Sequence, residues 1–207
     1  MGFFKSIFGP SKDEIWGQIA QDIDGEYNDA GFFGRDVLKY RHGEWEIHLD
    51  TFTRSSNSGQ HQSSTTYTRM RVPFKNKDQL YFKIFPENFF SPVGKFFGLQ
   101  DIQIGDSFFD DSFVIKGNNE SRIKEFLSDS RVRELIQAQP RVHLEVKDDE
   151  GWFGASFPAG VDELYFETYG VIKDPHTVKL LFELFTTILD RLVEIDSAYE
   201  SAPGVNL

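Results

Sequence analysis

An amphipathic pattern near the end of the chain most constrains the fold. Asp174-Pro175 is a strong helix start, because an Asp side chain accepts free backbone N–H groups at an N-cap and proline fits the first helical position. Apolar side chains then recur at helical spacing on one face: Val178, Leu181, Phe182, Phe185, Ile188, Leu189, Leu192 and Ile195. A long helix with this apolar face has to pack against a second layer of structure.

Strand patterns earlier in the chain predict that the second layer is a β-sheet. Residues 45–50 and 142–147 alternate strictly between apolar and polar side chains, which is typical of strands with one face in water. His48 and His143 fall on the polar side, so we expect both to face solvent. The polar segment 54–65 predicts a long hairpin loop. Further strands are predicted at 66–72, 80–85, 112–116, 152–157 and 164–169.

Capping signals place shorter helices around these strands. Residues 11–14 form a capping box, which starts a helix that Asp24-Gly25 ends. Two short helices are predicted in the middle of the chain, at about 119–127 and 130–137. The sequence therefore predicts an α+β fold, in which a mainly antiparallel sheet carries an N-terminal helix, two short middle helices and a long C-terminal helix packed on it.

A chain of 207 residues is long enough for one sizeable core, and it contains no linker that would separate two domains. We therefore expect a single domain over residues 11–200. An apolar N-terminal segment, 1–10, precedes this domain, and a flexible tail, 201–207, follows it.

Aromatic side chains are unusually frequent, with 22 Phe, 7 Tyr and 3 Trp, so rings should fill much of the core. Two aromatic groups stand beside glycine or proline, where burial is less assured. These groups are Phe3, Phe4, Ile7 and Phe8, and then Phe89, Phe90, Phe96 and Phe97. We interpret both as surfaces that contact another protein, a second copy of the chain or, weakly, a membrane surface. The alternative for the first group is that it folds back onto the core.

Charge and cysteine content narrow the class of protein. A net charge of −11 argues against a nucleic-acid partner, because a field of that sign repels the phosphate backbone. The absence of cysteine excludes disulfides and thiol chemistry and suits a reducing cytoplasm. No segment approaches the roughly 20 apolar residues that span a membrane. We expect a cytoplasmic protein that is at most peripheral at the inner membrane.

The residue patterns of the common enzyme classes are missing. The chain contains no phosphate-binding loop, no dinucleotide fingerprint, no G-x-S-x-G elbow and no H-E-x-x-H zinc motif. None of its five histidines has a second histidine two to four residues ahead, so no local metal pair exists. The acidic groups within 106–111 and 148–150 have turn chemistry. The sequence thus predicts no catalytic residue, no metal site and no cofactor.

One segment could line a ligand groove. Residues 152–166 are dense in aromatic side chains and glycines, which allow close approach of a ligand. The candidate lining residues are His48, His143, Trp152 and Tyr165. The competing interpretation is a hairpin whose rings fill the core.

The run from Gly105 to Glu120, Gly-Asp-Ser-Phe-Phe-Asp-Asp-Ser-Phe-Val-Ile-Lys-Gly-Asn-Asn-Glu, resembles a family of uncharacterised bacterial proteins with a GDxxFDxxFxIxGxD strand-turn-helix motif. Residues 66–71 and 148–154 extend the resemblance over most of the chain, and Asn119 stands where the motif has Asp. The resemblance implies a bacterial cytosolic protein and brings no catalytic residues with it. It implies structural roles only: core anchors for Phe109 and Phe113, and turn and cap residues for Asp106 and Asn118.

Two hypotheses on function follow from these patterns. The first is a non-enzymatic binding or assembly protein that uses its aromatic N-terminus and the aromatic group at 89–97. The second is a small-ligand-binding protein, or an unfamiliar enzyme, with a cleft near the hairpin at 148–169.

Overall fold

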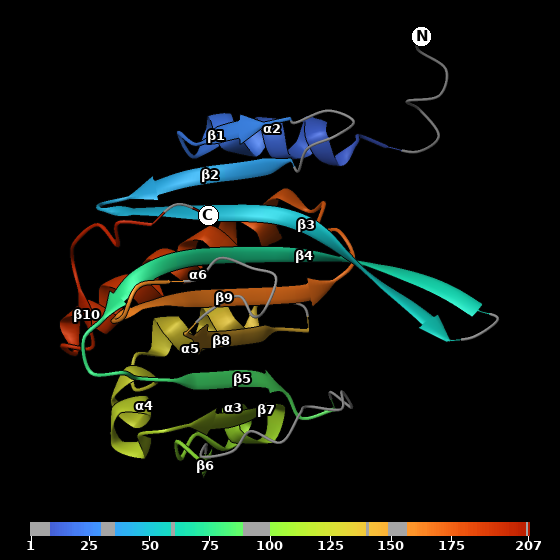
Figure 1. The fold of residues 1–207 in the computed structure, drawn as a ribbon. Helices are drawn as coiled ribbons and strands as arrows, with labels where there is room; N and C mark the ends of the chain where they lie inside the picture. The colour runs from blue at the N-terminus through green and yellow to red at the C-terminus, as the bar shows by residue number, and fades with distance from the viewer. Residues whose placement is uncertain are drawn as a thin grey trace, which may run out of the picture.

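The computed structural model describes residues 9–29, 36–58, 61–88, 100–139, 141–148, 157–205 and 207. Ten strands form one sheet in the order β1-β2-β3-β4-β9-β8-β5-β7-β6, with β10 paired to β4, and every pair is antiparallel (Figure 1). The strands are β1 (Glu26–Asn28), β2 (Val37–His42), β3 (Trp45–Ser58), β4 (His61–Asn76), β5 (Phe82–Pro86), β6 (Gln100–Ile102), β7 (Phe113–Gly117), β8 (His143–Lys147), β9 (Val161–Tyr169) and β10 (Ala198–Tyr199).

The longest helix lies across the middle of this sheet. Its eight buried residues include Leu181, Phe185 and Ile188, and they join the strand side chains in one core. In Figure 1 this helix, α6, passes behind the central strands, and α2 and α5 lie against it. The helices are α2 (Lys12–Asp22), α3 (Ser107–Ser112), α4 (Glu120–Phe126), α5 (Ser130–Gln137) and α6 (Pro175–Glu194).

The predicted fold class is confirmed, and the capping signals explain why. Ser11 and Glu14 make the reciprocal bonds of a capping box at the start of α2. Asn119 caps α4, and Asp174 caps α6 by accepting the Thr177 backbone N–H at 2.7 Å. The two segments 45–50 and 66–72, each predicted as a strand, pair with one another, with His48 opposite Arg71.

Two predictions about local structure are wrong. The expected loop at 54–65 is instead a continuation of β3 and β4, with Arg54 opposite Thr65 and Ser55 opposite Ser64. Serines and threonines can pair across strands, and a ribbon that is polar on both faces shows no alternation by which a sequence pattern would reveal it. Residues 107–112 form helix α3, which was not predicted, and Asp106 caps it. The expected strand at 152–157 lies outside the described residues except for Phe157.

The expectation that His48 faces solvent is also wrong, because its exposed fraction is 4%. His143 is half-buried rather than exposed. Both lie on the sheet face opposite the helices, where polar side chains on neighbouring strands cover one another. The tail residues Ala202 to Val205 help to line a hollow beside His48 on this face.

Candidate binding pocket on the polar face of the sheet

Strand β9 shows how the two faces of the sheet divide. Leu164 and Phe166 belong to the hydrophobic core beneath the helices. Glu163, Tyr165 and Glu167 point the other way, since successive side chains alternate between faces, yet their exposed fractions are only 0%, 5% and 8%. Buried charges need compensating partners, so the structure of this face depends on ion pairs.

The antiparallel register supplies those partners in rows across the strands. Asp50 on β3 lies opposite Arg69 on β4, which lies opposite Glu167 on β9, which lies opposite His143 on β8. Asp50 receives two hydrogen bonds from Arg69, at 2.8 and 2.6 Å, and a third contact from Arg71 at 3.3 Å. The carboxylate of Asp50 is thus held by two guanidinium groups in a site that is 1% exposed.

Glu167 is held from two directions. Arg54 donates to both of its carboxylate oxygens, at 3.0 and 2.8 Å, and the Tyr165 hydroxyl donates to one of them at 2.8 Å. Burial raises the pKa of Tyr165, and the Glu167 charge beside it acts in the same direction, so this tyrosine stays a hydrogen-bond donor. Arg54 neutralises the charge of Glu167 locally.

A second row of cross-strand neighbours runs from His48 on β3 through Arg71 and Tyr165 to Glu145 on β8. Burial acts to raise the pKa of Glu145, but His143 and the Lys83 ammonium outweigh it and lower the pKa to about 2. Lys83 forms an ion pair with this carboxylate, and His143 Nε2 lies 3.7 Å from it. Burial lowers the pKa of His48, although its contact with Glu46, at 2.5 Å, opposes the change.

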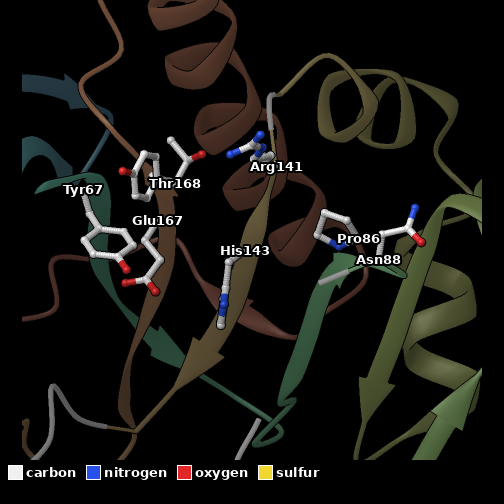
Figure 2. A pocket seen from close by; sticks show the side chains of 8 residues that line it. Tyr67, Pro86, Asn88, Arg141, His143, Glu167 and Thr168 are labelled. Atoms are coloured by element: carbon white, nitrogen blue, oxygen red, sulfur yellow. The ribbon is translucent and has the colours of Figure 1, made fainter. Parts of the chain in front are cut away.

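A cavity of about 430 Å³ opens on this face beside Tyr67 of β4, where β9 and β5 end and β8 begins. Figure 2 shows Tyr67 and Glu167 on one side, Pro86 and Asn88 on the other, and Arg141 with His143 between them. Such a volume is within the range of small-ligand pockets in proteins. The lining residues are Tyr67, Pro86, Asn88, Arg141, His143, Glu167, Thr168 and Tyr169.

The polar side chains of the pocket differ in how many hydrogen bonds they already make within the protein. The Thr168 hydroxyl donates to the Gly170 carbonyl at 2.8 Å and accepts the Ile172 N–H at 2.9 Å. Arg141, by contrast, is exposed and forms no ion pair or hydrogen bond with a described residue. Arg141 therefore has a complete set of donors to offer to a ligand.

The structure places the predicted groove residues on one face without bringing them together. His143 lines the pocket, and Tyr165 lies behind it as a donor to Glu167. His48 lines a separate hollow of about 330 Å³, because β4 and β9 stand between β3 and β8. Trp152 and the two aromatic groups, Phe3, Phe4, Ile7, Phe8 and Phe89, Phe90, Phe96, Phe97, lie outside the described residues.

Sequence reasoning missed Tyr67, Arg141 and Glu167. Tyr67 and Glu167 both occur in segments that were predicted as strands, but only the sheet order shows that these strands are neighbours. Arg141 follows a helix that the sequence predicted, and its position carries no pattern of its own.

Two acidic residues of the 105–120 motif bond backbone N–H groups at helix α3, where Asp106 is the N-cap and Asp110 lies in the first turn rather than in the predicted turn. Asp106 accepts the Phe109 N–H at 3.2 Å, and Asp110 accepts the N–H groups of Ile104 and Gly105, each at 2.9 Å. Phe109 is fully buried, and its ring centroid lies 4.8 Å from that of Phe113. The cap of α4 is Asn119 rather than Asn118, which instead bonds the backbone of residues 79 and 81.

No three His, Asp or Glu side chains in the described part of the chain are arranged to hold a metal ion. None of the described helices has the length and apolar character needed to cross a membrane.

Comparison with known proteins gives a likeness of fold. No family model and no curated protein matches this chain. Its structure is similar to the crystal structure of the mycobacterial trehalose monomycolate transport factor A, TtfA, with a TM-score of 0.51. The alignment covers 87% of this chain and 94% of that one at 8% sequence identity. At this identity the likeness shows that the two chains share a fold, and the resemblance of residues 105–120 to a bacterial family stays a prediction.

Proposed function

We propose that this chain is a non-enzymatic binding protein that holds a small ligand in the pocket between Tyr67 and Pro86. The observation that carries the proposal is the cavity of about 430 Å³ beside β4 and the ends of β9, β8 and β5, which tyrosine rings and the cation Arg141 help to line. Ligand sites in proteins are concave and mostly apolar, with a few polar groups that orient the ligand.

The state of the acidic group beside the pocket supports binding over catalysis. A general base needs a lone pair within reach of the substrate proton. Both oxygens of Glu167 already accept charged hydrogen bonds from Arg54, and one accepts a third from Tyr165. This carboxylate is better suited to fixing the shape of the pocket than to taking up a proton.

The likeness to a transport factor is consistent with the proposal. That protein bears a name for transport rather than for a reaction, and it shares its fold with this chain over 87% of this chain's length.

A pocket-filling variant tests the proposal. Asn88 is exposed at the rim, so Asn88→Trp should fill the cavity without disturbing the core. The full chain is screened against a metabolite library by thermal shift, and small molecules that copurify are identified by native mass spectrometry. Ligands that bind the folded chain should raise the Tm of the wild type, and Asn88→Trp should abolish the rise.

The control places the same new side chain elsewhere. Gln21 is exposed on α2, so Gln21→Trp should leave the thermal shifts as they are in the wild type. Equal shifts in wild type and Asn88→Trp would place the ligand elsewhere, and no shift across the library would contradict a small-ligand role.

The sequence supports a second candidate, which is docking on a partner or a membrane surface through Phe3, Phe4, Ile7 and Phe8. Four large apolar side chains in one short segment favour it. Deletion of residues 2–9 should then reduce self-association or sedimentation with anionic liposomes. If both are unchanged, this candidate fails, and the pocket proposal is unaffected.

A further inference from the structure

We propose, on the basis of the binding role above, that the pocket selects an organic anion and that Arg141 binds its charged group. The ligand class is a carboxylate or a phosphate monoester attached to a flat or apolar body. A guanidinium group matches such oxyanions because its N–H groups form a planar fork that can donate two parallel hydrogen bonds.

The balance of charge in the pocket favours an anion even though the whole chain is acidic. Glu167 is the only acidic side chain among the described lining residues, and the Arg54 guanidinium neutralises it through two hydrogen bonds. Most other lysines and arginines of the described chain are held in ion pairs, such as Arg69 with Asp50 and Arg131 with Glu183. The charge of Arg141 has no such partner among the described residues.

Arg141 also stands where two hollows meet. A second cavity, of about 360 Å³, shares Arg141, Thr168 and Tyr169 with the pocket and is lined on its far side by Lys173. Lys173 is exposed and forms no ion pair with a described residue. The Asp174 carboxylate lines this cavity as well and offsets the charge of Lys173, so the preference for an anion rests on Arg141.

The walls of the pocket suit a flat or apolar body. The rings of Tyr67 and Tyr169 meet edge to face, with centroids 6.0 Å apart, and Pro86 faces them across the cavity (Figure 2). Tyr67 is fixed from behind, because Phe52 stacks on it at 5.3 Å and the Arg54 guanidinium lies 4.8 Å from its ring centre. A wall of fixed rings loses little entropy when a ligand packs against it.

The backbone at Arg141 adds an independent observation. Its φ of 49° lies in the left-handed region, which costs energy for any residue with a Cβ. Residues in such conformations concentrate at binding and catalytic sites. A glycine would be favoured at this position on conformational grounds.

The test compares paired ligands that differ in charge alone. Benzoate, 2-naphthoate and 4-phenylbutyrate are each titrated into the full chain by calorimetry beside their neutral amides, and 2-naphthyl phosphate is added as the phosphate probe. At least one acid should bind the wild type about tenfold or more tightly than its amide, as expected for one charged contact. The naphthoate and phosphate arms then show which oxyanion is preferred.

Variants assign the preference to Arg141. Arg141→Gln should remove the preference for the acid and leave binding of the amide unchanged, whereas Arg141→Lys should retain part of it. Arg41 is a matched control, because it is another exposed cation without an ion pair to a described residue and lines the separate hollow beside His48. Arg41→Gln should bind as the wild type does.

The outcomes separate the inference from the function on which it rests. Equal binding of acid and amide by the wild type overturns selection of an anion while leaving the pocket as a binding site. An equal loss of preference in Arg41→Gln and Arg141→Gln overturns the assignment to Arg141. If none of the probes binds, the inference fails, whereas the proposed binding role is decided by the library screen with Asn88→Trp.

Discussion

At the scale of single residues, the polar face of the sheet depends on carboxylates that each hold more than one partner. Asp50 joins Arg69 and Arg71 from the neighbouring strand, and Glu167 joins Arg54 and Tyr165. Breaking a buried ion pair by removing one partner costs much more than the pair itself contributes, because a charge is left without compensation. The most sensitive positions on this face should therefore be the shared carboxylates.

Asp50→Asn tests this sensitivity. The substitution leaves two guanidinium groups without their carboxylate in a site that is 1% exposed, so it should lower the free energy of unfolding by roughly 3–5 kcal/mol. Urea denaturation followed by circular dichroism measures the change. Asp101→Asn is the control, since Asp101 forms its ion pair with Lys116 while its side chain is 76% exposed, and its loss should be about 1 kcal/mol or less.

Arg141→Gly should separate stability from binding. Glycine adopts a φ of 49° without steric cost, so the variant should gain about 1 kcal/mol of stability, measured as a higher Tm, while it loses the preference for organic anions. Arg141→Ala loses the same charge but keeps a Cβ, so it should not gain stability. A fall in Tm for the glycine variant would show that the arginine side chain stabilises the fold and would weaken the case for a binding role.

The sequence predicted which side chains lie on the polar side of a strand, but it did not predict which strands are neighbours on that face. The alternation at 45–50 correctly places His48 and Asp50 on the polar side of a strand, but it cannot show that both are buried. Asp50 is covered by Arg69 and Arg71 of β4. The other edge of β4 is covered by β9, whose residues are nearly a hundred positions further along the chain. Local patterns carry no information on such pairing.

At the scale of elements, the β3–β4 hairpin differs from the rest of the sheet. Strand β2 pairs with β3 only as far as Asp50, and β9 pairs with β4 only from Tyr67 onward. The remaining part of the hairpin, residues 53–58 and 61–66, is a two-stranded ribbon that reaches past the sheet (Figure 1). Two-stranded ribbons have little stability of their own.

Hydrogen exchange should therefore divide β3 into two parts. Backbone amides within 55–58 and 61–64 should exchange faster than those within 48–50, which have a paired strand on each side. Mass spectrometry of peptic fragments measures both segments in one experiment, so the second is an internal control. Equal protection would show that the ribbon is covered by another part of the chain or by a second copy.

The elements also show where sequence patterns succeed. The capping box at Ser11 and the Asp174-Pro175 pair correctly predicted where helices α2 and α6 begin. A cap can be predicted in this way because it is a contact between residues only a few positions apart. The same reasoning failed at 54–65, where polar side chains on both faces hide the strand, and at 107–112, where the run Ser-Phe-Phe-Asp-Asp-Ser is too short to show a helical period.

At the scale of the whole molecule, one sheet carries two interiors of different chemistry. The helix side is apolar and contains rings such as Trp16, Phe82 and Phe185, whose burial does not depend on pH. The opposite side is ionic, so its contribution to stability changes with protonation. Acid should lower the free energy of unfolding through the ion pairs of the polar face, whereas the packing of the helix-covered core should not change with pH.

Glu145 sets the pH range of this effect. Its pKa in the folded chain, about 2, lies below its usual value of 4.5, so the folded chain releases its proton more readily than the unfolded chain does. The resulting stability is fully present above pH 4.5 and is lost as the pH falls toward 2, an effect of about 3 kcal/mol.

His48 acts in the same direction over a higher range, because its lowered pKa makes the folded chain resist protonation that the unfolded chain accepts near pH 6.5. Asp162 opposes both, since burial raises its pKa and protonation then favours the folded state.

Urea unfolding at a series of pH values from 7 to 2.5 tests the assignment, with Glu145→Gln beside the wild type. The wild type should lose stability steeply below pH 4.5. Glu145→Gln should be less stable at pH 7, because Lys83 loses its buried partner, and its stability should fall less between pH 4.5 and 2.5, because the group responsible no longer titrates. His48→Gln should change the slope near pH 6 and leave the steep acid limb as it is. Parallel curves for the wild type and Glu145→Gln would mean that the acid sensitivity resides in other carboxylates.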